Sequence, residues 1–365
     1  MRTLVWHWGR RGAGPIFAAR LTTALRGLPG EMAALSLPVA AELLAAQGAP
    51  ACDWAEPTYE TRAGYFRQRL LSPFLGGRTR RQLRALRPDI AICAMPALLD
   101  ARMLAGLQRL DIPYAMIVHD ATAHPGDGLS FRALGQGTAL RGARHLFCLS
   151  GHVEAELRRQ GLGQGRQGLT KLWHPPLGFA MKLAPAEPGV RPRLLHFGRL
   201  LPYKGLDLLA EALALLGPDR DFELRICGEG PRSATLARLA AMDGVDVENR
   251  WFSDAELPGL LAWAGGLVLP YREASQSGVA AMAIAAGRQV LATNVGGLPE
   301  QLGHLPAALL CAPEPHAIAQ GLQSLSSRLR EVPAPEATAD SLAISQAESR
   351  VDWQDFAAAM LAALV

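Results

Sequence analysis

Short apolar runs alternate with helix-like segments along most of this chain. The apolar runs are four or five residues long and end in polar or glycine-rich turns. Such runs are typical of strands buried on both faces of a sheet, and strands that alternate with helices predict a parallel sheet with crossover connections. The expected strands are Thr3–Trp6, Leu35–Val39, Ile90–Ala94, Tyr114–Val118, His145–Leu149, Leu194–Phe197, Glu223–Cys227, Gly266–Leu269 and Val290–Thr293.

A proline-rich stretch, Ala184–Arg193, interrupts this alternation and reads as a linker. We therefore expect an α/β protein of two doubly wound, Rossmann-like domains that face a central cleft at the carboxyl ends of their strands. The expected domains are residues 1–184 and 185–345, and residues 346–365 form a last helix that returns to the first domain. The expected helices are Phe17–Leu25, Val153–Leu157, Leu206–Leu216, Ala234–Ala241, Val279–Ala286 and Trp353–Leu364.

Composition excludes several classes of protein. The 365 residues are 49% hydrophobic and 19% charged, which predicts a globular chain with a large core. The five cysteines form no CxxC pair, which argues against a disulfide framework or a zinc site and fits reduced thiols in the cytoplasm. No apolar run has the length of a membrane span, the first residues do not resemble a signal peptide, and a net charge of +4 gives no argument for nucleic acid.

Lysine is rare in this chain, which holds three Lys against 34 Arg. Lys204 lies in the turn after Leu194–Phe197, five residues beyond Arg199, and Gly198 and Gly205 flank the two cations. The planar guanidinium of Arg can bind two phosphate oxygens side by side, and the Lys ammonium is a compact point charge. This turn is suited to a diphosphate.

Three more turns follow in the same half of the chain. They contain Gly228, then Glu273 with Ser275, Gln276, Ser277 and Gly278, and then Gly296 and Gly297. Each alone is an ordinary strand-to-helix turn, in which Gly only permits a positive φ. In this order and spacing, over about residues 194–300, they resemble the donor-binding domain of glycosyltransferase family 4, the retaining enzymes of the GT-B fold.

The resemblance implies roles for these residues. Arg199 and Lys204 match the cationic pair that holds the donor diphosphate, and Glu273 matches a glutamate that contacts the donor sugar. Gly278 and its neighbours would open a helix whose N–H groups suit a phosphate. The structural alternative for Glu273 is a solvated loop carboxylate.

One position departs from the family pattern. The place of a second glutamate, which contacts the nucleotide ribose in the family, falls on Met282. Met is a poor hydrogen-bond partner for a ribose hydroxyl. Either Ser275, Gln276 or Ser277 supplies the contact, or the donor nucleotide is bound weakly, or the chain has lost activity. We favour a core position for Met282, because Val279 and the alanines around it make this helix apolar on most sides.

The first half of the chain offers a glycine-rich turn and a histidine. Gly12 and Gly14 follow the first strand, and in the family this loop approaches the donor phosphate and the acceptor. His119 follows Tyr114–Val118, and the family places a histidine here that hydrogen-bonds the donor sugar; a structural histidine capped by Asp120 is an equal alternative. A metal site of His119, Asp120 and His124 is a third reading, but no Asp-x-Asp motif supplies further ligands.

A basic segment without Asp or Glu runs from Thr61 to Pro88 and interleaves arginines with aromatic residues and leucines. This composition suits an anionic membrane surface or a lipid-linked acceptor, and the structural alternative is a solvated basic helix. The arginines are Arg62, Arg67, Arg69, Arg78, Arg80, Arg81, Arg84 and Arg87.

The sequence as a whole predicts a retaining, metal-independent hexosyltransferase that acts in the cytoplasm, or at the inner face of the membrane. Its donor would be a UDP- or GDP-sugar used as substrate, with no cofactor, and its acceptor a polysaccharide or a glycolipid. Two alternatives stay open: a GT-B protein that binds a nucleotide-sugar or a partner without catalysis, and a GT-B sugar-nucleotide epimerase. The epimerase needs several carboxylates near the sugar, and only Glu273 can be placed.

Overall fold

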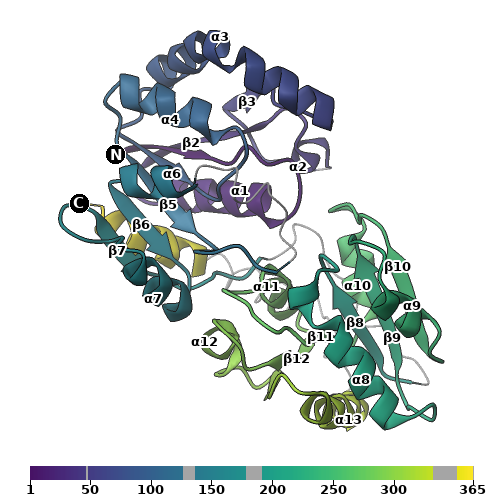
Figure 1. Ribbon diagram of the computed structural model, residues 1–365. Coiled ribbons are helices and arrows are strands. Elements are labelled where there is room, and N and C mark those ends of the chain that lie inside the picture. Colours follow the sequence, from purple (N-terminus) through teal and green to yellow (C-terminus); the bar gives the residue numbers. More distant parts are fainter. Residues whose placement is uncertain (47, 126–135, 178–190, 332–351, 365) are drawn as a thin grey trace. The chain divides into compact units, whose positions relative to one another are not determined.

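The computed structural model describes residues 1–46, 48–125, 136–177, 191–331 and 352–364 (Figure 1). The chain divides into two compact units. Of the described residues, the first unit holds 1–123, 136–175 and 352–364, and the second holds 124–125, 176–177 and 191–331. The expected linker up to residue 190, and the expected boundaries near residues 184 and 345, lie outside the described residues.

The first unit is built on a parallel sheet of seven strands in the order β3-β2-β1-β4-β5-β6-β7. Its order reverses between β1 and β4, as in doubly wound folds. Its elements are β1 Arg2–Trp6, α1 Ala13–Arg26, β2 Met32–Pro38, α2 Glu42–Ala45, β3 Trp54–Glu56, α3 Arg62–Leu86, β4 Ile90–Cys93, α4 Asp100–Arg109, β5 Tyr114–Val118, α6 Gln136–Gly142, β6 His145–Cys148, α7 Gly151–Arg159 and β7 Gly168–Lys171.

The second unit is built on a parallel sheet of six strands in the order β10-β9-β8-β11-β12-β13, which reverses between β8 and β11. Its elements are β8 Arg193–Phe197, η1 Pro202–Lys204, α8 Leu206–Leu216, β9 Glu223–Gly228, α9 Ala234–Ala240, β10 Val245–Asn249, α10 Leu257–Trp263, β11 Gly266–Leu269, α11 Gly278–Ala285, β12 Gln289–Thr293, α12 Leu298–Leu302, β13 Ala308–Cys311 and α13 Pro315–Glu331.

Successive residues of β8 serve opposite faces of the second sheet. Leu194 belongs to the core that α8, α9 and α13 cover, and Leu195 faces α10 and α11 together with Leu267 of β11. This is why β8 is apolar apart from Arg193 and the buried His196, since both faces of a strand in a doubly wound sheet are covered. The prediction of two Rossmann-like α/β domains is confirmed.

A helix over residues 352–362, drawn in yellow in Figure 1, packs on the first unit. The ring of Trp353 lies 4.9 Å from the ring of Phe17 in α1, and Phe356 lies 5.8 Å from Trp173. Both helix residues are buried, with Phe356 at 0% exposure. The end of the chain thus completes the core around α1.

Candidate functional site

Lys204 lies buried between two tyrosine rings in the second unit. It ends η1, is 8% exposed, and its Nζ lies 3.7 Å from the ring centroid of Tyr271 and 4.9 Å from that of Tyr203. Two aromatic faces stabilise an ammonium that has lost much of its water. Tyr271 stays neutral itself, because burial raises its pKa to about 12.

Arg199 joins the same cluster. Its Nη2 donates a hydrogen bond to the Tyr203 hydroxyl at 2.8 Å, and its guanidinium carbon lies 5.6 Å from the Tyr203 ring centroid. Tyr203 therefore contacts both cations and holds the arginine through its hydroxyl. Burial of His196 behind the cluster, with a smaller contribution from Lys204, lowers the pKa of that histidine to about 4.

Four of the glycines expected at this site bring the loops into backbone contact. A Cβ at Gly205 would overlap the carbonyl oxygen of Pro270, and a Cβ at Gly228 would overlap that of Gly198. A Cβ at Gly296 would overlap the carbonyl oxygen of Ala274. These three glycines and Gly198 have φ between +54° and +150°. Gly198 therefore serves turn geometry, and the other three serve both close approach and turn geometry.

Backbone hydrogen bonds join the loops that follow neighbouring strands of the sheet. Leu200 N–H donates to Glu229 O, Arg272 N–H donates to Tyr203 O, and Gly297 N–H donates to Ala274 O. The loops after β8, β9, β11 and β12 thus form one connected rim at the carboxyl edge of the sheet. Ligands of doubly wound folds bind at this edge where the strand order reverses, here between β8 and β11.

The loop before α11 carries Glu273 and the expected Ser-Gln-Ser-Gly segment. Ser275 and Ser277 are buried, Ser277 caps α11 by accepting a hydrogen bond from Ala280 N–H, and Gly278 is the first helical residue. The Glu273 carboxylate, 47% exposed, lies 3.8 Å from Nδ1 of His124. His124 groups with the second unit and stacks on Tyr203 at 4.6 Å.

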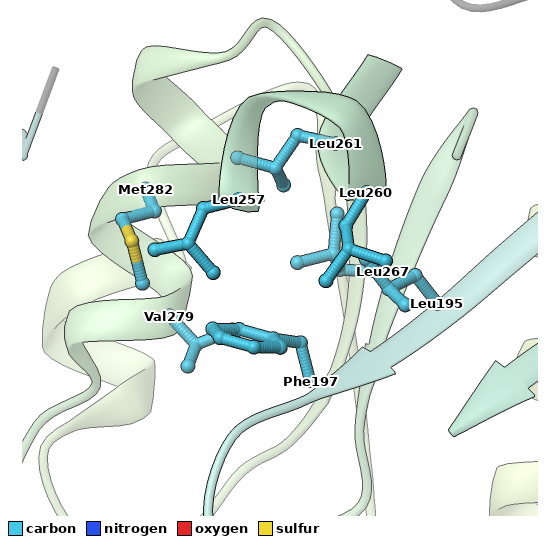
Figure 2. A pocket seen from close by; sticks show the side chains of 8 residues that line it. All are labelled: Leu195, Phe197, Leu257, Leu260, Leu261, Leu267, Val279 and Met282. Carbon is cyan, nitrogen blue, oxygen red and sulfur yellow. The ribbon is translucent and has the colours of Figure 1, made fainter. Parts of the chain in front are cut away.

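Met282 points into an apolar pocket on one face of the second sheet (Figure 2). It is 8% exposed, and the pocket has no polar side chain in its lining. The lining residues are Leu195, Phe197, Leu257, Leu260, Leu261, Leu267, Val279 and Met282. The structure therefore gives Met282 a packing role, which agrees with the expected core position.

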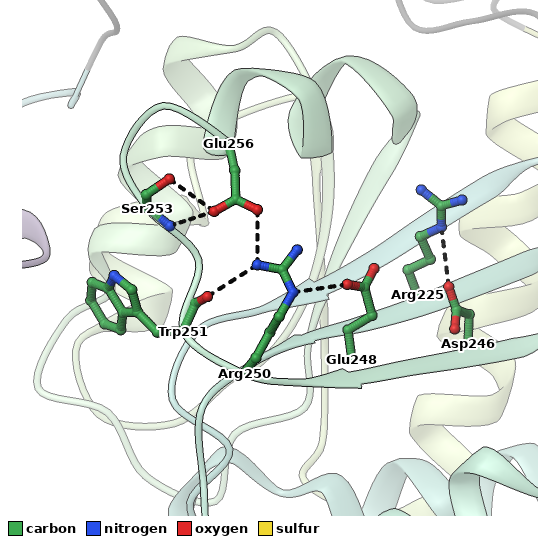
Figure 3. Close-up of polar contacts among 7 residues, drawn as sticks. All are labelled: Arg225, Asp246, Glu248, Arg250, Trp251, Ser253 and Glu256. Atoms are coloured by element: carbon green, nitrogen blue, oxygen red, sulfur yellow. Dashed lines mark hydrogen bonds and ion pairs between the residues drawn. The ribbon is translucent and has the colours of Figure 1, made fainter.

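Sequence reasoning missed the loop after β10. Asn249 holds Gly230 at two points: its Oδ1 accepts from Gly230 N–H at 3.0 Å and its Nδ2 donates to Gly230 O at 3.1 Å. Figure 3 shows Arg250 joined to Glu248, to the carbonyl of Trp251 and to Glu256. The signal was an Asn at a strand end, since this side chain often satisfies backbone groups in turns.

In the first unit, His119 is held by the neighbouring strand end. Its Nε2 donates to Ala94 O at 2.9 Å, so Nδ1 is the acceptor nitrogen of the neutral ring. The ring is 6% exposed and lies 5.0 Å from Phe17 and 6.2 Å from His174. Burial lowers the pKa of His119 and keeps the imidazole uncharged at neutral pH.

The glycine-rich turn after β1 packs on a second histidine, His7. A Cβ at Gly14 or at Gly9 would overlap the His7 ring. Gly12 precedes α1 with φ 78°, and its Cβ would meet nothing within 4 Å, so Gly12 serves turn geometry and Gly14 serves close packing. Among the described residues, no group of His, Cys, Asp or Glu is arranged to hold a metal ion, so the reading of His119, Asp120 and His124 as ligands gains no support.

Comparison with known proteins identifies the class. Residues 191–328 match the model of glycosyl transferases group 1, and residues 8–171 match that of a glycosyl transferase 4-like domain. The fold is that of crystallised Anabaena HepE in complex with UDP and glucose, with a TM-score of 0.71, 16% identity and 99% of both chains covered. The two units are thus those of a GT-B protein.

Curated relatives agree with these matches. The D-inositol 3-phosphate glycosyltransferase of Jonesia denitrificans is 38% identical over 128 residues, which are 32% of this chain and 30% of that protein. The MMP alpha-(1->4)-mannosyltransferase of Mycolicibacterium hassiacum is 35% identical over 134 residues, 35% of this chain and 32% of that protein. The chain therefore spans about a third of the length of these relatives. It belongs to glycosyltransferase family 4.

Proposed function

We propose that this protein transfers a sugar from a nucleotide-sugar donor to a saccharide or lipid-linked acceptor. The observation that carries the proposal is the cluster of Arg199 and Lys204 with Tyr203 and Tyr271 at the switch point of the second sheet. Negative charge grows on the diphosphate as the donor bond breaks, and a preorganised donor at such a site is typically worth about 3–4 kcal/mol of the barrier.

The same cluster supports a reaction that is independent of metal and of any other cofactor. Arg199 and Lys204 supply the positive charge that a divalent ion supplies in other glycosyl transfers. The N–H groups at the start of α11, which the Ser277 cap holds in place, add a partial positive charge beside them. Activity that persists in EDTA would agree with this proposal, and activity that only Mg²⁺ or Mn²⁺ restores would contradict it.

We assign Glu273 and His119 to the donor sugar. Glu273 lies in the rim of the second unit, partly exposed and beside His124, so its carboxylate can accept hydrogen bonds from sugar hydroxyls. His119, a residue of the first unit, is assigned from the resemblance to the family. Retention of the anomeric configuration is proposed from the match of the donor-domain motifs to retaining enzymes.

The donor is proposed to be a hexose linked to UDP or GDP. HepE is crystallised with UDP and glucose, and a mannosyltransferase is among the relatives. A thermal-shift screen of UDP-, GDP- and dTDP-hexoses should raise the melting temperature with one base above the others, because a ligand that binds only the folded state stabilises it. Release of that nucleotide from its sugar should follow. Binding by none of the nucleotides would overturn the proposed function.

A binding protein without transfer is the second candidate, and Met282 is the observation that favours it. An apolar residue stands where the family has its second glutamate, and it faces away from polar groups into the pocket of Figure 2. Nucleotide binding without sugar release, in the presence or absence of acceptors, would select this candidate.

We also propose that α3 docks on an anionic membrane surface. Phe66, Leu70 and Phe74, spaced by four residues and thus on one face, are 63%, 78% and 83% exposed. Tyr65 and Gln68 on another face contact Tyr59 and Arg102 of the first unit. The side chain of Arg62 lies outside the described residues, and Arg67, Arg69, Arg78, Arg81, Arg84 and Arg87 are exposed while Arg80 is half-buried.

The exposed arginines and the exposed apolar residues of α3 together favour an anionic membrane as its partner. An exposed apolar stripe among arginines fits a surface that combines anionic headgroups with acyl chains. Among the described residues, none of the helices has both the length and the apolar character needed to cross a bilayer. Association through α3 would bring the protein to the surface in which a lipid-linked acceptor is held.

A further inference from the structure

Gln301 holds the residue from which α11 starts. Its side-chain Oε1 accepts a hydrogen bond from Ser277 N–H at 2.9 Å, and its Nε2 donates to Ser277 O at 3.0 Å. A primary amide that meets both backbone groups of one residue imitates a neighbouring strand. Because Gln301 lies on α12, it ties the loop after β12 to the loop after β11.

Ser277 in turn connects Gln301 to the buried lysine. The Ser277 hydroxyl accepts from Ala280 N–H at 3.2 Å and lies 3.5 Å from the Tyr271 hydroxyl. The Tyr271 ring lies 3.7 Å from Nζ of Lys204. A chain of contacts therefore runs from Gln301 through Ser277 and Tyr271 to Lys204.

We infer that Gln301 is a positioning residue for nucleotide binding, which it serves by fixing the start of α11 relative to Lys204. The inference rests on the proposed function and adds to it a residue that would touch neither sugar nor phosphate. Two groups that bind one diphosphate must keep their spacing, because a misplaced group loses binding energy that preorganisation had secured. Correct spacing of these groups matters more in this chain because α11 carries Met282 at the place where the family has a glutamate that binds ribose. Nucleotide binding then depends more strongly on the contacts to the diphosphate.

Gln301→Met tests the inference directly. The substitution keeps the length of the side chain and removes both hydrogen bonds to Ser277. We expect about a tenfold rise in the Kd for UDP or GDP, whichever the wild type binds, measured by calorimetry. Hydrogen exchange at the backbone of residues 273–280 should become faster in the ligand-free protein. Gln323→Met on an exposed position of α13 is the matched control and should change neither measurement.

Gln301→Glu gives a second test with a pH signature. A carboxylate can accept from Ser277 N–H but repels Ser277 O, whereas a protonated carboxyl can serve both groups, as the amide does. The ratio of the variant's Kd to that of the wild type should therefore shrink as pH falls from 7.5 to about 5, near the carboxyl range. A role confined to stability would lower the melting temperature and leave this ratio independent of pH.

The outcomes separate the inference from the function on which it rests. Unchanged Kd and unchanged exchange in folded Gln301→Met would overturn the inference and leave the glycosyltransferase proposal intact. A constant ratio of Kd values across pH for Gln301→Glu would overturn it as well. A wild type that binds neither UDP nor GDP would overturn both proposals. Weaker binding in Gln301→Met together with recovery of Gln301→Glu at low pH would establish the positioning role.

Discussion

The ammonium of Lys204 lies 3.7 Å above the ring of Tyr271, within the loop that follows the neighbouring strand β11. Lys204 therefore connects two loops: it lies in the loop after β8, and the Tyr271 ring that stabilises it lies in the loop after β11. This relationship explains the choice of lysine in an arginine-rich protein. The compact ammonium suits this position, where Lys204 is 8% exposed, and a larger guanidinium would require the packed rings to move.

Lys204→Ala should reduce kcat by on the order of 10²-fold or more with folding intact. The charge lost is the one proposed to neutralise the diphosphate leaving group. Lys204→Arg should not restore the rate fully, because the larger guanidinium would displace the charge from the position of the buried ammonium. Lys171→Ala, an exposed lysine at the end of β7, is the control. Rates near wild type in Lys204→Ala would refute the diphosphate assignment.

Alanine substitutions at Gly205 and Gly217 distinguish the cost of steric overlap from the cost of backbone strain. Both have φ near +70°, but only a Cβ at Gly205 would overlap the backbone, at Pro270 O, while nothing lies within 4 Å of one at Gly217. Gly217→Ala should cost about 1–3 kcal/mol of the free energy of unfolding, because alanine rarely adopts the backbone conformation of Gly217, with φ 74° and ψ −171°. Gly205→Ala should cost more and should also weaken nucleotide binding. Urea unfolding and calorimetry measure the two effects, and equal costs would contradict the role of close approach.

The strands that could be predicted from sequence lie in the interior of the two sheets. They are β1, β2, β4, β5 and β6 in the first unit and β8, β9, β11 and β12 in the second. Most are runs of apolar residues, although His196 lies within β8 and Arg225 within β9. The strands that were missed, β3, β7, β10 and β13, are edge strands. An edge strand is covered less completely, and polar residues interrupt the pattern of β7, Gly168–Lys171, and of β10, Val245–Asn249. The edge strand β13, Ala308–Cys311, was missed although its four residues are apolar.

The sequence was sufficient to name several residues of the candidate site. It was not sufficient to predict which side chains contact one another there. Arg199, Lys204 and Gly205 could be named from their spacing. Tyr203 could not, although it lies beside Lys204, because a tyrosine in a turn has no distinctive spacing and its role depends on the ring of Tyr271. Gln301 was equally hidden, since a side-chain amide that meets Ser277 is a contact made by the fold.

Met282→Glu should destabilise the fold without improving nucleotide binding. The side chain lies in the apolar pocket, where an unpaired carboxylate would cost several kcal/mol or stay protonated. We expect a marked fall in melting temperature and no decrease in the Kd of the nucleotide. Ala285→Glu, at a partly exposed position of the same helix, should be milder. Tighter binding in a stable Met282→Glu protein would show that the site faces ribose.

Acid should destabilise the second unit through His196. Burial lowers its pKa to about 4 in the folded state, from an ordinary value of 6.5. The unfolded chain therefore binds the proton first, so stability is complete above pH 6.5 and is lost as pH falls towards 4, by about 3 kcal/mol in total. His196→Asn retains a donor for Val268 O, which His196 Nδ1 contacts at 2.9 Å, and cannot be protonated in this range.

The measurement is urea unfolding at pH 7, 6 and 5 for the wild type and for His196→Asn. The difference in stability between the two proteins should change with pH, in the sense that the wild type loses more at pH 5. His316→Asn, at an exposed position of α13, should follow the wild type at every pH. Parallel pH curves for wild type and His196→Asn would contradict a buried neutral imidazole.

The two chemical components of α3 make separable contributions to membrane docking. Replacing Phe66, Leu70 and Phe74 by Ser should weaken binding to vesicles that contain anionic lipid at all salt concentrations, since a buried side chain of this kind contributes about 1.5–3 kcal/mol. Replacing the arginines of α3 by Gln should weaken binding chiefly at low salt, because the Debye length of about 8 Å at physiological ionic strength already screens part of the attraction.

Leu215→Ser, at an exposed position of α8 in the second unit, is the control. Co-sedimentation with anionic and with zwitterionic vesicles distinguishes these effects. Binding that is absent at low salt, or that survives both sets of substitutions, would refute docking through α3.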